Sequence, residues 1–119
     1  MLMKATFFKS ITMKFGLKES VVKNIENIII DFTQVKTVII YGSRAKGNFK
    51  PGSDIDLTFI GDDLTSTLLN KISLRIDDLF LPYTFDLSVF GHINNEDLIE
   101  HIKRGGKIFY QRKPSEAIF

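Results

Sequence analysis

The chain of 119 residues lacks cysteine altogether and contains only two histidines, His92 and His101. The absence of cysteine excludes disulfide bonds, thiolate catalysis and cysteine-ligated zinc. Two histidines are too few for a histidine-rich metal site, and both are expected to lie on the surface. A bound metal ion would therefore depend on oxygen ligands, which are typical of Mg²⁺ or Mn²⁺ sites.

Long apolar runs are missing as well. The longest are short blocks such as 28–30 and 38–41, far below the roughly 18 residues that a membrane span needs. No sustained apolar segment follows Lys4 and Lys9, so the sequence does not indicate a signal peptide. These features favour a cytoplasmic protein without a membrane partner.

Neither sign of charge dominates, because 16 Lys and Arg oppose 14 Asp and Glu. This balance neither favours nor excludes a nucleic-acid partner. The hydrophobic share of 44% is typical of a globular protein, and the length fits one core. We expect an N-terminal extension over residues 1–12, either an ordered arm or a flexible segment, one domain over 13–112, and a C-terminal tail over 113–119.

Hydrophobic periodicity predicts alternating helices and strands. Apolar residues that recur every three or four positions predict three amphipathic helices, at 18–32, 65–81 and 94–105. Short β-branched or alternating runs predict strands. These lie at 35–41, 54–60, 84–90 and, with a weaker pattern, 107–110. Elements in this order predict a small α/β fold in which helices cover one sheet.

The first segment that departs from core building is Gly42–Gly47 (GSRAKG). A glycine directly after a buried strand, followed by a serine and a short helical stretch, presents backbone N–H groups and a hydroxyl to an anion such as phosphate. The segment is not a P-loop, because Asn48 follows where that motif requires lysine. Taken alone, the pattern also fits an ordinary strand-to-helix turn.

The second such segment is Asp54-Ile55-Asp56. Strand periodicity places the two aspartates on one face with Cα atoms roughly 6.5–7 Å apart, close enough for their side chains to converge on metal ions. The alternative is a solvent-facing polar side of a strand. Asp86 occupies the polar face of a later strand, so three carboxylates would gather beside the glycine-serine loop if the two strands are neighbours.

Together, Gly42–Gly47, Asp54–Asp56 and Asp86 resemble the signature of the DNA polymerase β-like nucleotidyltransferases. The small size of the chain makes it similar to the minimal nucleotidyltransferase (MNT) group, with the likeness extending over residues 13–112. The resemblance implies the nucleotidyltransferase fold, a small mixed sheet flanked by helices in the order α-β-α-β-α-β.

The resemblance also implies which residues act. Asp54 and Asp56 would bind two Mg²⁺ ions, for which Mn²⁺ could substitute, while Asp86 would bind one of them and help to deprotonate the attacking hydroxyl. Gly42 and Ser43 would hold the phosphates of ATP.

Arg44 is interpreted as a third nucleotide-binding residue that could clamp phosphate. A solvated loop charge is the alternative for this side chain.

MNT proteins are similar to antitoxins (MntA-type) that pair with small helical HEPN toxins. The resemblance therefore implies a hetero-oligomer with a HEPN protein and transfer of AMP from ATP to a tyrosine of that toxin. Two other functions stay open. One is a nucleotidyltransferase for a small molecule or RNA, and the other is a non-catalytic module that occludes its partner. A homodimer also stays open.

Tyr41 and a cluster of basic residues near the C-terminus are expected to have no direct role in the site. Tyr41 is expected in the core or at its rim. A solvated face is expected for the basic cluster of Lys103, Arg104, Lys107, Arg112 and Lys113, rather than an RNA-binding or partner-binding surface.

Overall fold

The computed structural model describes residues 13–114 of the chain. The predicted extension over 1–12 and residues 115–119 of the predicted tail lie outside the described residues. The described elements are β1 (Met13–Lys14), β2 (Leu17–Lys18), α2 (Glu19–Ile29), β3 (Val35–Tyr41), α3 (Ser43–Lys46), β4 (Ile55–Gly61), α4 (Ser66–Asp77), β5 (Phe85–Val89), the 3₁₀ turn η1 (Phe90–His92), α5 (Glu96–Gly105) and β6 (Lys107–Gln111).

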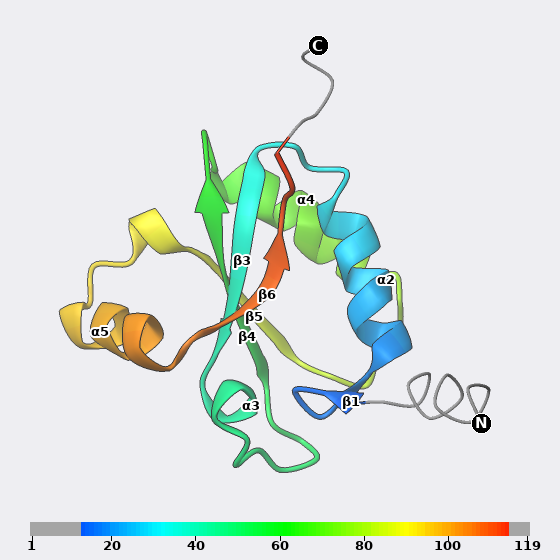
Figure 1. Cartoon of the computed structure of the whole chain (residues 1–119). Coiled ribbons are helices and arrows are strands. Elements are labelled where there is room, and N and C mark those ends of the chain that lie inside the picture. The colour runs from blue at the N-terminus through cyan, green and yellow to red at the C-terminus, as the bar shows by residue number, and fades with distance from the viewer. Residues whose placement is uncertain (1–12, 115–119) are drawn as a thin grey trace.

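Four of these strands form one mixed sheet in the order β5-β4-β3-β6 (Figure 1). Strand β3 pairs antiparallel with both β4 and β6, whereas β4 and β5 are parallel. The parallel pair is joined through α4, as parallel neighbours require a crossover connection. The predicted fold, a small mixed sheet flanked by helices, is confirmed.

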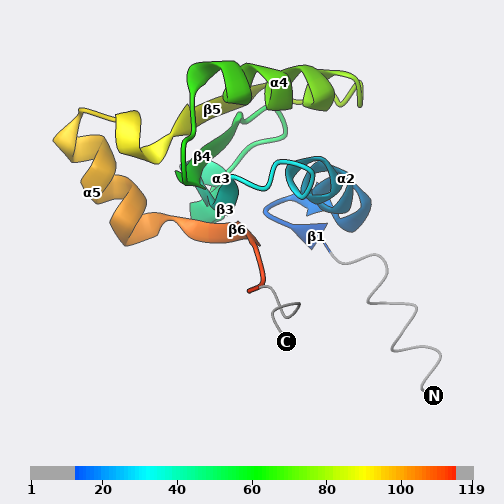
Figure 2. The same ribbon diagram turned by 90° about the horizontal axis from the view of Figure 1, so that it is seen from above.

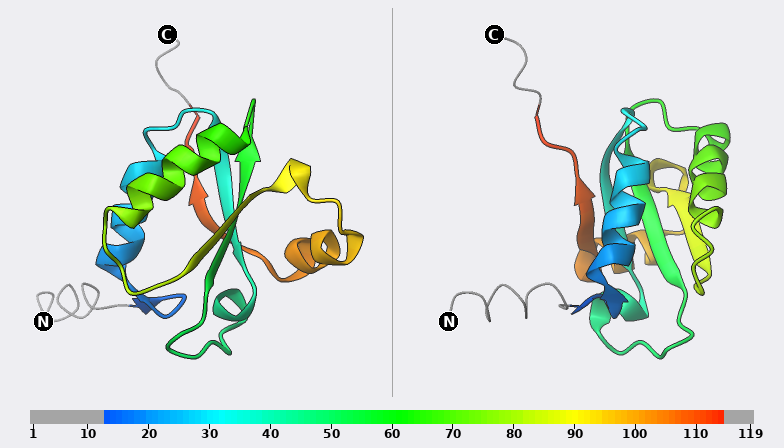
Figure 3. Two further views of the ribbon diagram at one scale, coloured as in Figure 1. Left: turned by 180° about the vertical axis from the view of Figure 1, so that it is seen from behind. Right: turned by 90° about the vertical axis from the view of Figure 1, so that its right-hand side faces the viewer.

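The two faces of the sheet differ in character. On β4, Ile55, Leu57 and Phe59 are fully buried, in one hydrophobic cluster with residues of α2 and α4. Figures 2 and 3 show α2 and α4 on one side of the sheet, and Figure 2 shows α5 on the other. Successive side chains of a strand point to opposite faces, so Asp56 and Thr58 face the side of α5.

Helix ends differ from the prediction by a few residues. Helix α2 ends at Ile29 and not at Phe32. Helix α4 ends at Asp77, four residues before the predicted end at Leu81. A tight turn stops α4, because the N–H of Phe80 donates to the Asp77 carbonyl at 3.0 Å and Phe80 adopts a left-handed φ of 52°.

The N-terminal part of the domain is more regular than predicted. Residues before Lys18 show no clear period in the sequence, yet β1 and β2 form a short antiparallel hairpin. Leu17 is fully buried in the core, and the ring of Phe15 stacks on that of Phe109 at 6.0 Å. These contacts with distant residues fix the hairpin, so local patterning could not reveal it.

Within residues 13–114, every helix is too short or too polar to serve as a membrane span.

Arg112 is half-buried, although the sequence suggested a solvated charge. Its Nε donates to the Val35 carbonyl at 2.8 Å. Its Nη2 donates to the carbonyls of Phe32 at 3.0 Å, Ile30 at 3.2 Å and Ile29 at 3.4 Å. These carbonyls belong to the end of α2 and the start of β3, where helix carbonyls lack partners within the helix. The guanidinium therefore supplies donors to carbonyls at the C-terminal end of α2. It also links this end of the helix to the segment that follows β6.

Replacement Arg112→Ala should lower the free energy of unfolding by about 1–3 kcal/mol, since several carbonyls, most of them partly buried, lose a charged donor. Urea denaturation followed by circular dichroism measures this change. Lys113→Ala, which removes an exposed charge at the next position, should leave the midpoint nearly unchanged. Equal midpoints for the two variants would contradict the role of Arg112.

Candidate active site

The parallel register of β4 and β5 brings two of the three predicted acids together. Asp56 and Asp86 are direct partners in this register, so their Cα atoms lie about 4.8 Å apart, the spacing of neighbouring strands. Both side chains point to the sheet face opposite the main core. Asp86 is exposed and Asp56 is half-buried.

Asp54 lies immediately before β4, one strand repeat ahead of Asp56, and is exposed. Within residues 13–114, no three Asp, Glu, His or Cys side chains are gathered closely enough to enclose one metal ion by themselves. Mg²⁺ sites of phosphoryl-transfer enzymes often use one or two carboxylates and take further ligands from substrate phosphates and water. The donor set at this position fits that description.

The electrostatics of Asp56 reflect this crowding. Burial raises the pKa of the Asp56 carboxyl above its usual value, and the negative charges of Asp86 and Asp54 raise it further. Among residues 13–114, no basic side chain contributes to this pKa. In this part of the chain the site therefore carries uncompensated negative charge, which a cation would relieve.

Gly42 is held against the carboxylate of Asp56. Tyr41 of β3 pairs with Asp56 of β4. Gly42 follows Tyr41, so its backbone lies close to Asp56. Gly42 has φ 78° and ψ −155°, a region that essentially only glycine adopts. A Cβ at this position would lie 2.6 Å from Oδ2 of Asp56. Ser43 follows as the first residue of α3, half-buried.

Arg44 has a different environment from the one that the sequence suggested. Its side chain is only 2% exposed. Nε donates to the Ser53 carbonyl at 3.1 Å and Nη1 donates to the Phe15 carbonyl at 3.0 Å. The buried guanidinium thus holds protein backbone, in place of the open phosphate clamp or the solvated charge expected from the sequence.

Sequence reasoning missed three polar neighbours of the acids. Tyr41 is buried, and burial raises the pKa of its hydroxyl. A hydrogen bond with Ser88 opposes this rise, and the charges of Asp86 and Asp56 add smaller increases. The Ser88 hydroxyl donates to Oγ1 of Thr58 at 2.9 Å. Ser and Thr at alternate strand positions on the acid-bearing face were the signal available in the sequence.

Helix α5 borders the same face. His101, expected on the surface, is half-buried, and its ring meets that of Tyr41 edge-on with centroids 6.5 Å apart. His92 is exposed as expected. The acids therefore lie between the α3 turn and α5. They are on the face of the sheet opposite to the one that α2 and α4 cover.

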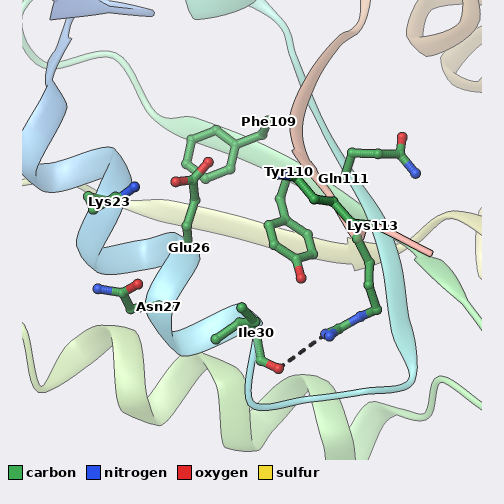
Figure 4. Close-up of a pocket in the computed structure, with 9 residues that line it drawn as sticks. Lys23, Glu26, Asn27, Ile30, Phe109, Tyr110, Gln111 and Lys113 are labelled. Atoms are coloured by element: carbon green, nitrogen blue, oxygen red, sulfur yellow. Dashed lines mark hydrogen bonds between the residues drawn. The ribbon is translucent and has the colours of Figure 1, made fainter. Parts of the chain in front are cut away.

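A separate groove of about 490 Å³ lies between α2 and β6 (Figure 4). Its lining includes Lys23, Glu26, Tyr110 and Arg112, and none of the predicted site residues. The dashed line in Figure 4 ends on the Ile30 carbonyl, which accepts the hydrogen bond from Arg112. This groove is therefore distinct from the acid-bearing face.

Removing the crowded charge should stabilise the protein. The raised pKa means that ionisation of Asp56 costs more in the folded than in the unfolded chain, so wild-type stability falls as pH rises from the unfolded-state pKa to the higher folded-state pKa. Asp56→Asn should avoid this fall and increase the free energy of unfolding at pH 7, without divalent ions, by a few tenths to about 1 kcal/mol.

The gain should disappear below the ordinary aspartate pKa of 3.8, where the wild-type carboxyl is protonated in both states. Denaturation curves of both proteins at several pH values measure it. Asp62→Asn, which neutralises an exposed acid just beyond the other end of β4, serves as the control. A stability gain that is the same at every pH would contradict the explanation.

Comparison with solved structures agrees with this fold. One similar structure is a toxin–antitoxin complex with AMP-PNP, at 19% identity over 74% of this chain and 74% of that chain, with a TM-score of 0.57. A second is the toxin–antitoxin complex MntA-HepT, at 14% identity over 80% and 74%, with a TM-score of 0.59. A third is a tri-AMPylated Shewanella oneidensis HEPN toxin in complex with an MNT antitoxin, at 16% identity over 76% and 73%, with a TM-score of 0.52.

No curated protein matches the chain. Residues 23–115, however, match the family model described as polymerase beta, nucleotidyltransferase. That range spans the glycine-serine turn, all three aspartates and every strand of the mixed sheet, and it is well over half of the chain. The chain therefore belongs to the polymerase beta nucleotidyltransferase family.

Proposed function

We propose that this protein is a metal-dependent protein adenylyltransferase, an MNT antitoxin that transfers AMP from ATP to a tyrosine of a HEPN toxin. The observation that carries the proposal is the placement of Asp56 beside Asp86, with Gly42 against the Asp56 carboxylate. Family membership supports nucleotidyl transfer. Similar structures that contain AMP-PNP or an AMPylated HEPN toxin support the nucleotide and the acceptor.

Each part of the site has a role in such a transfer. Asp54, Asp56 and Asp86 would hold divalent cations, which when bound neutralise charge on the triphosphate. The backbone at Gly42 is bare of a side chain, so a phosphate group can approach it closely. The hydroxyl of Ser43 can donate a hydrogen bond to a phosphate oxygen.

The transfer forms a bond between the acceptor oxygen and the α-phosphorus of ATP, and breaks the bond from that phosphorus to the β-phosphate. Pyrophosphate leaves, and the acceptor hydroxyl loses its proton. Asp86 would accept that proton, and its exposed position on the acid-bearing face supports this role. Helix α5 borders this face, so a partner's tyrosine would approach between α3 and α5.

The direct test incubates the protein with α-labelled ATP, Mg²⁺ and a purified HEPN toxin. Label should appear on the toxin, and EDTA should abolish it. Asp54→Asn and Asp86→Asn should each reduce the transfer rate more than about a hundredfold, because even partners of metal ligands often contribute 10- to 100-fold. Asp62→Asn should retain the wild-type rate.

Two results would redirect the proposal. Label on a small molecule or RNA in the absence of toxin would favour another acceptor for the same chemistry. Neutralisation of the toxin by Asp54→Asn as complete as by the wild type would favour occlusion without catalysis.

Gly42→Ala should reduce transfer about 10- to 100-fold, because an alanine at this φ and ψ is strained and its Cβ would meet the Asp56 carboxylate. Initial rates at saturating ATP measure the loss. Gly52→Ala is the matched control, since its added Cβ would lie within 4 Å of no atom in residues 13–114 beyond its two chain neighbours. Equal rates for the two variants would show that the tight contact at Gly42 is not needed.

A further inference from the structure

Arg44 lies at the centre of several segments that are far apart in the sequence. Its guanidinium is almost fully buried, at 2% exposure. Besides its bonds to the carbonyls of Ser53 and Phe15, its Cζ lies 5.1 Å from the ring centroids of both Phe49 and Tyr83. Two rings and two carbonyls thus surround one cation.

The partners of Arg44 lead directly to the acids. Ser53 immediately precedes Asp54, and Phe49 lies earlier in the same loop. Tyr83 precedes Thr84, whose carbonyl accepts a hydrogen bond from the N–H of Ile55 at 2.9 Å. That bond joins the first residue of β4 to the residue before β5, one position before Asp56 and two positions before Asp86.

Arg44 itself is the second residue of α3, directly after Gly42 and Ser43. One side chain therefore connects the glycine-serine turn, the loop that ends at Asp54 and the loop that leads to Asp86. The bond to Phe15 adds the β1–β2 hairpin, which is packed on Phe109.

A lysine could not replace these contacts. The planar fork of arginine donates from two nitrogens in different directions while its faces stack on aromatic rings, whereas a lysine ammonium is a compact, strongly hydrated charge. The network thus depends on the shape of the guanidinium as well as on its charge.

We propose that Arg44 is a positioning residue that sets Asp54 and the glycine-serine turn relative to Asp56 and Asp86, so that cation binding depends on it. This proposal depends on the proposed function in one respect, namely that the three aspartates bind cations. Arg44 acts through the carbonyl of Ser53 and the rings of Phe49 and Tyr83, and does not itself contact the nucleotide.

The test measures binding of Mn²⁺ alone to the full chain, from the electron paramagnetic resonance signal of free Mn²⁺. Arg44→Lys should weaken Mn²⁺ binding about tenfold or more, the lower range for partners of metal ligands. Arg112→Lys is the matched control, because that guanidinium also binds backbone carbonyls and stacks on a ring, that of Tyr110. It acts at the Val35 end of β3, about 20 Å from Tyr41 along the strand.

Arg112→Lys should lower the urea midpoint but leave Mn²⁺ binding within about twofold of the wild type. Equal Mn²⁺ binding by Arg44→Lys and the wild type would overturn the proposal. A rise in the KM for ATP with unchanged Mn²⁺ binding would overturn it too, since that result assigns Arg44 to direct phosphate contact.

A milder variant keeps the test decisive if Arg44→Lys does not fold. Phe49→Leu removes one of the two rings beside Arg44 and should weaken Mn²⁺ binding about threefold, with wild-type circular dichroism. Unchanged Mn²⁺ binding in that variant would count against the proposal. A wild-type protein that binds no Mn²⁺ would overturn both the site and the positioning role, whereas Mn²⁺ binding without AMP transfer would overturn only the proposed function.

Discussion

Repulsion between like charges on neighbouring strands is the constraint around which this protein is organised. Asp56 and Asp86 face each other in parallel register, and burial together with nearby acids raises the pKa of Asp56. The rest of the fold must hold these two carboxylates close together although they repel each other. It does so on β4 by alternation, because odd-numbered residues from Ile55 to Phe59 enter the core while Asp56 faces the site. Strand β4 thus supplies both buried apolar side chains, which stabilise the fold, and the Asp56 carboxylate, which destabilises it. A shift of one residue in the pairing of β4 would exchange the two faces.

Two arginines, Arg44 and Arg112, join backbone segments that are far apart in the sequence. Arg112 binds carbonyls at the junction of α2 and β3, and Arg44 binds carbonyls of the β1–β2 hairpin and the loop before Asp54. Both side chains also stack on aromatic rings. In a chain without cysteine, these guanidinium groups cross-link segments in the way that disulfide bonds or a larger core do elsewhere. The cross-links are polar, so water competes with them wherever they become exposed.

Local patterning was sufficient for the four strands of the mixed sheet, for the three longer helices to within a few residues at their ends, and for the alternating acids. The sequence left open whether the strands of Asp56 and Asp86 are neighbours, and the structure pairs them in parallel, with α4 in the crossover connection that such a pair requires. What could not be predicted are contacts between residues far apart in sequence. Tyr41 opposite Asp56, His101 against Tyr41, and the inward turn of Arg44 each depend on register or on packing across the sheet. The charge of Arg44 was visible in the sequence, whereas its carbonyl partner at Phe15 lies 29 residues away.

Helix α5 is attached to the rest of the fold differently from α2 and α4. Ile102 is its only buried residue and lies outside the main hydrophobic cluster, while the helix borders the acid-bearing face. Most substitutions on its surface therefore cost little conformational stability, although they change one border of the acid-bearing face. The surroundings of the carboxylates can thus diverge on this helix while the sheet stays unchanged, without being limited by the marginal stability of so small a domain.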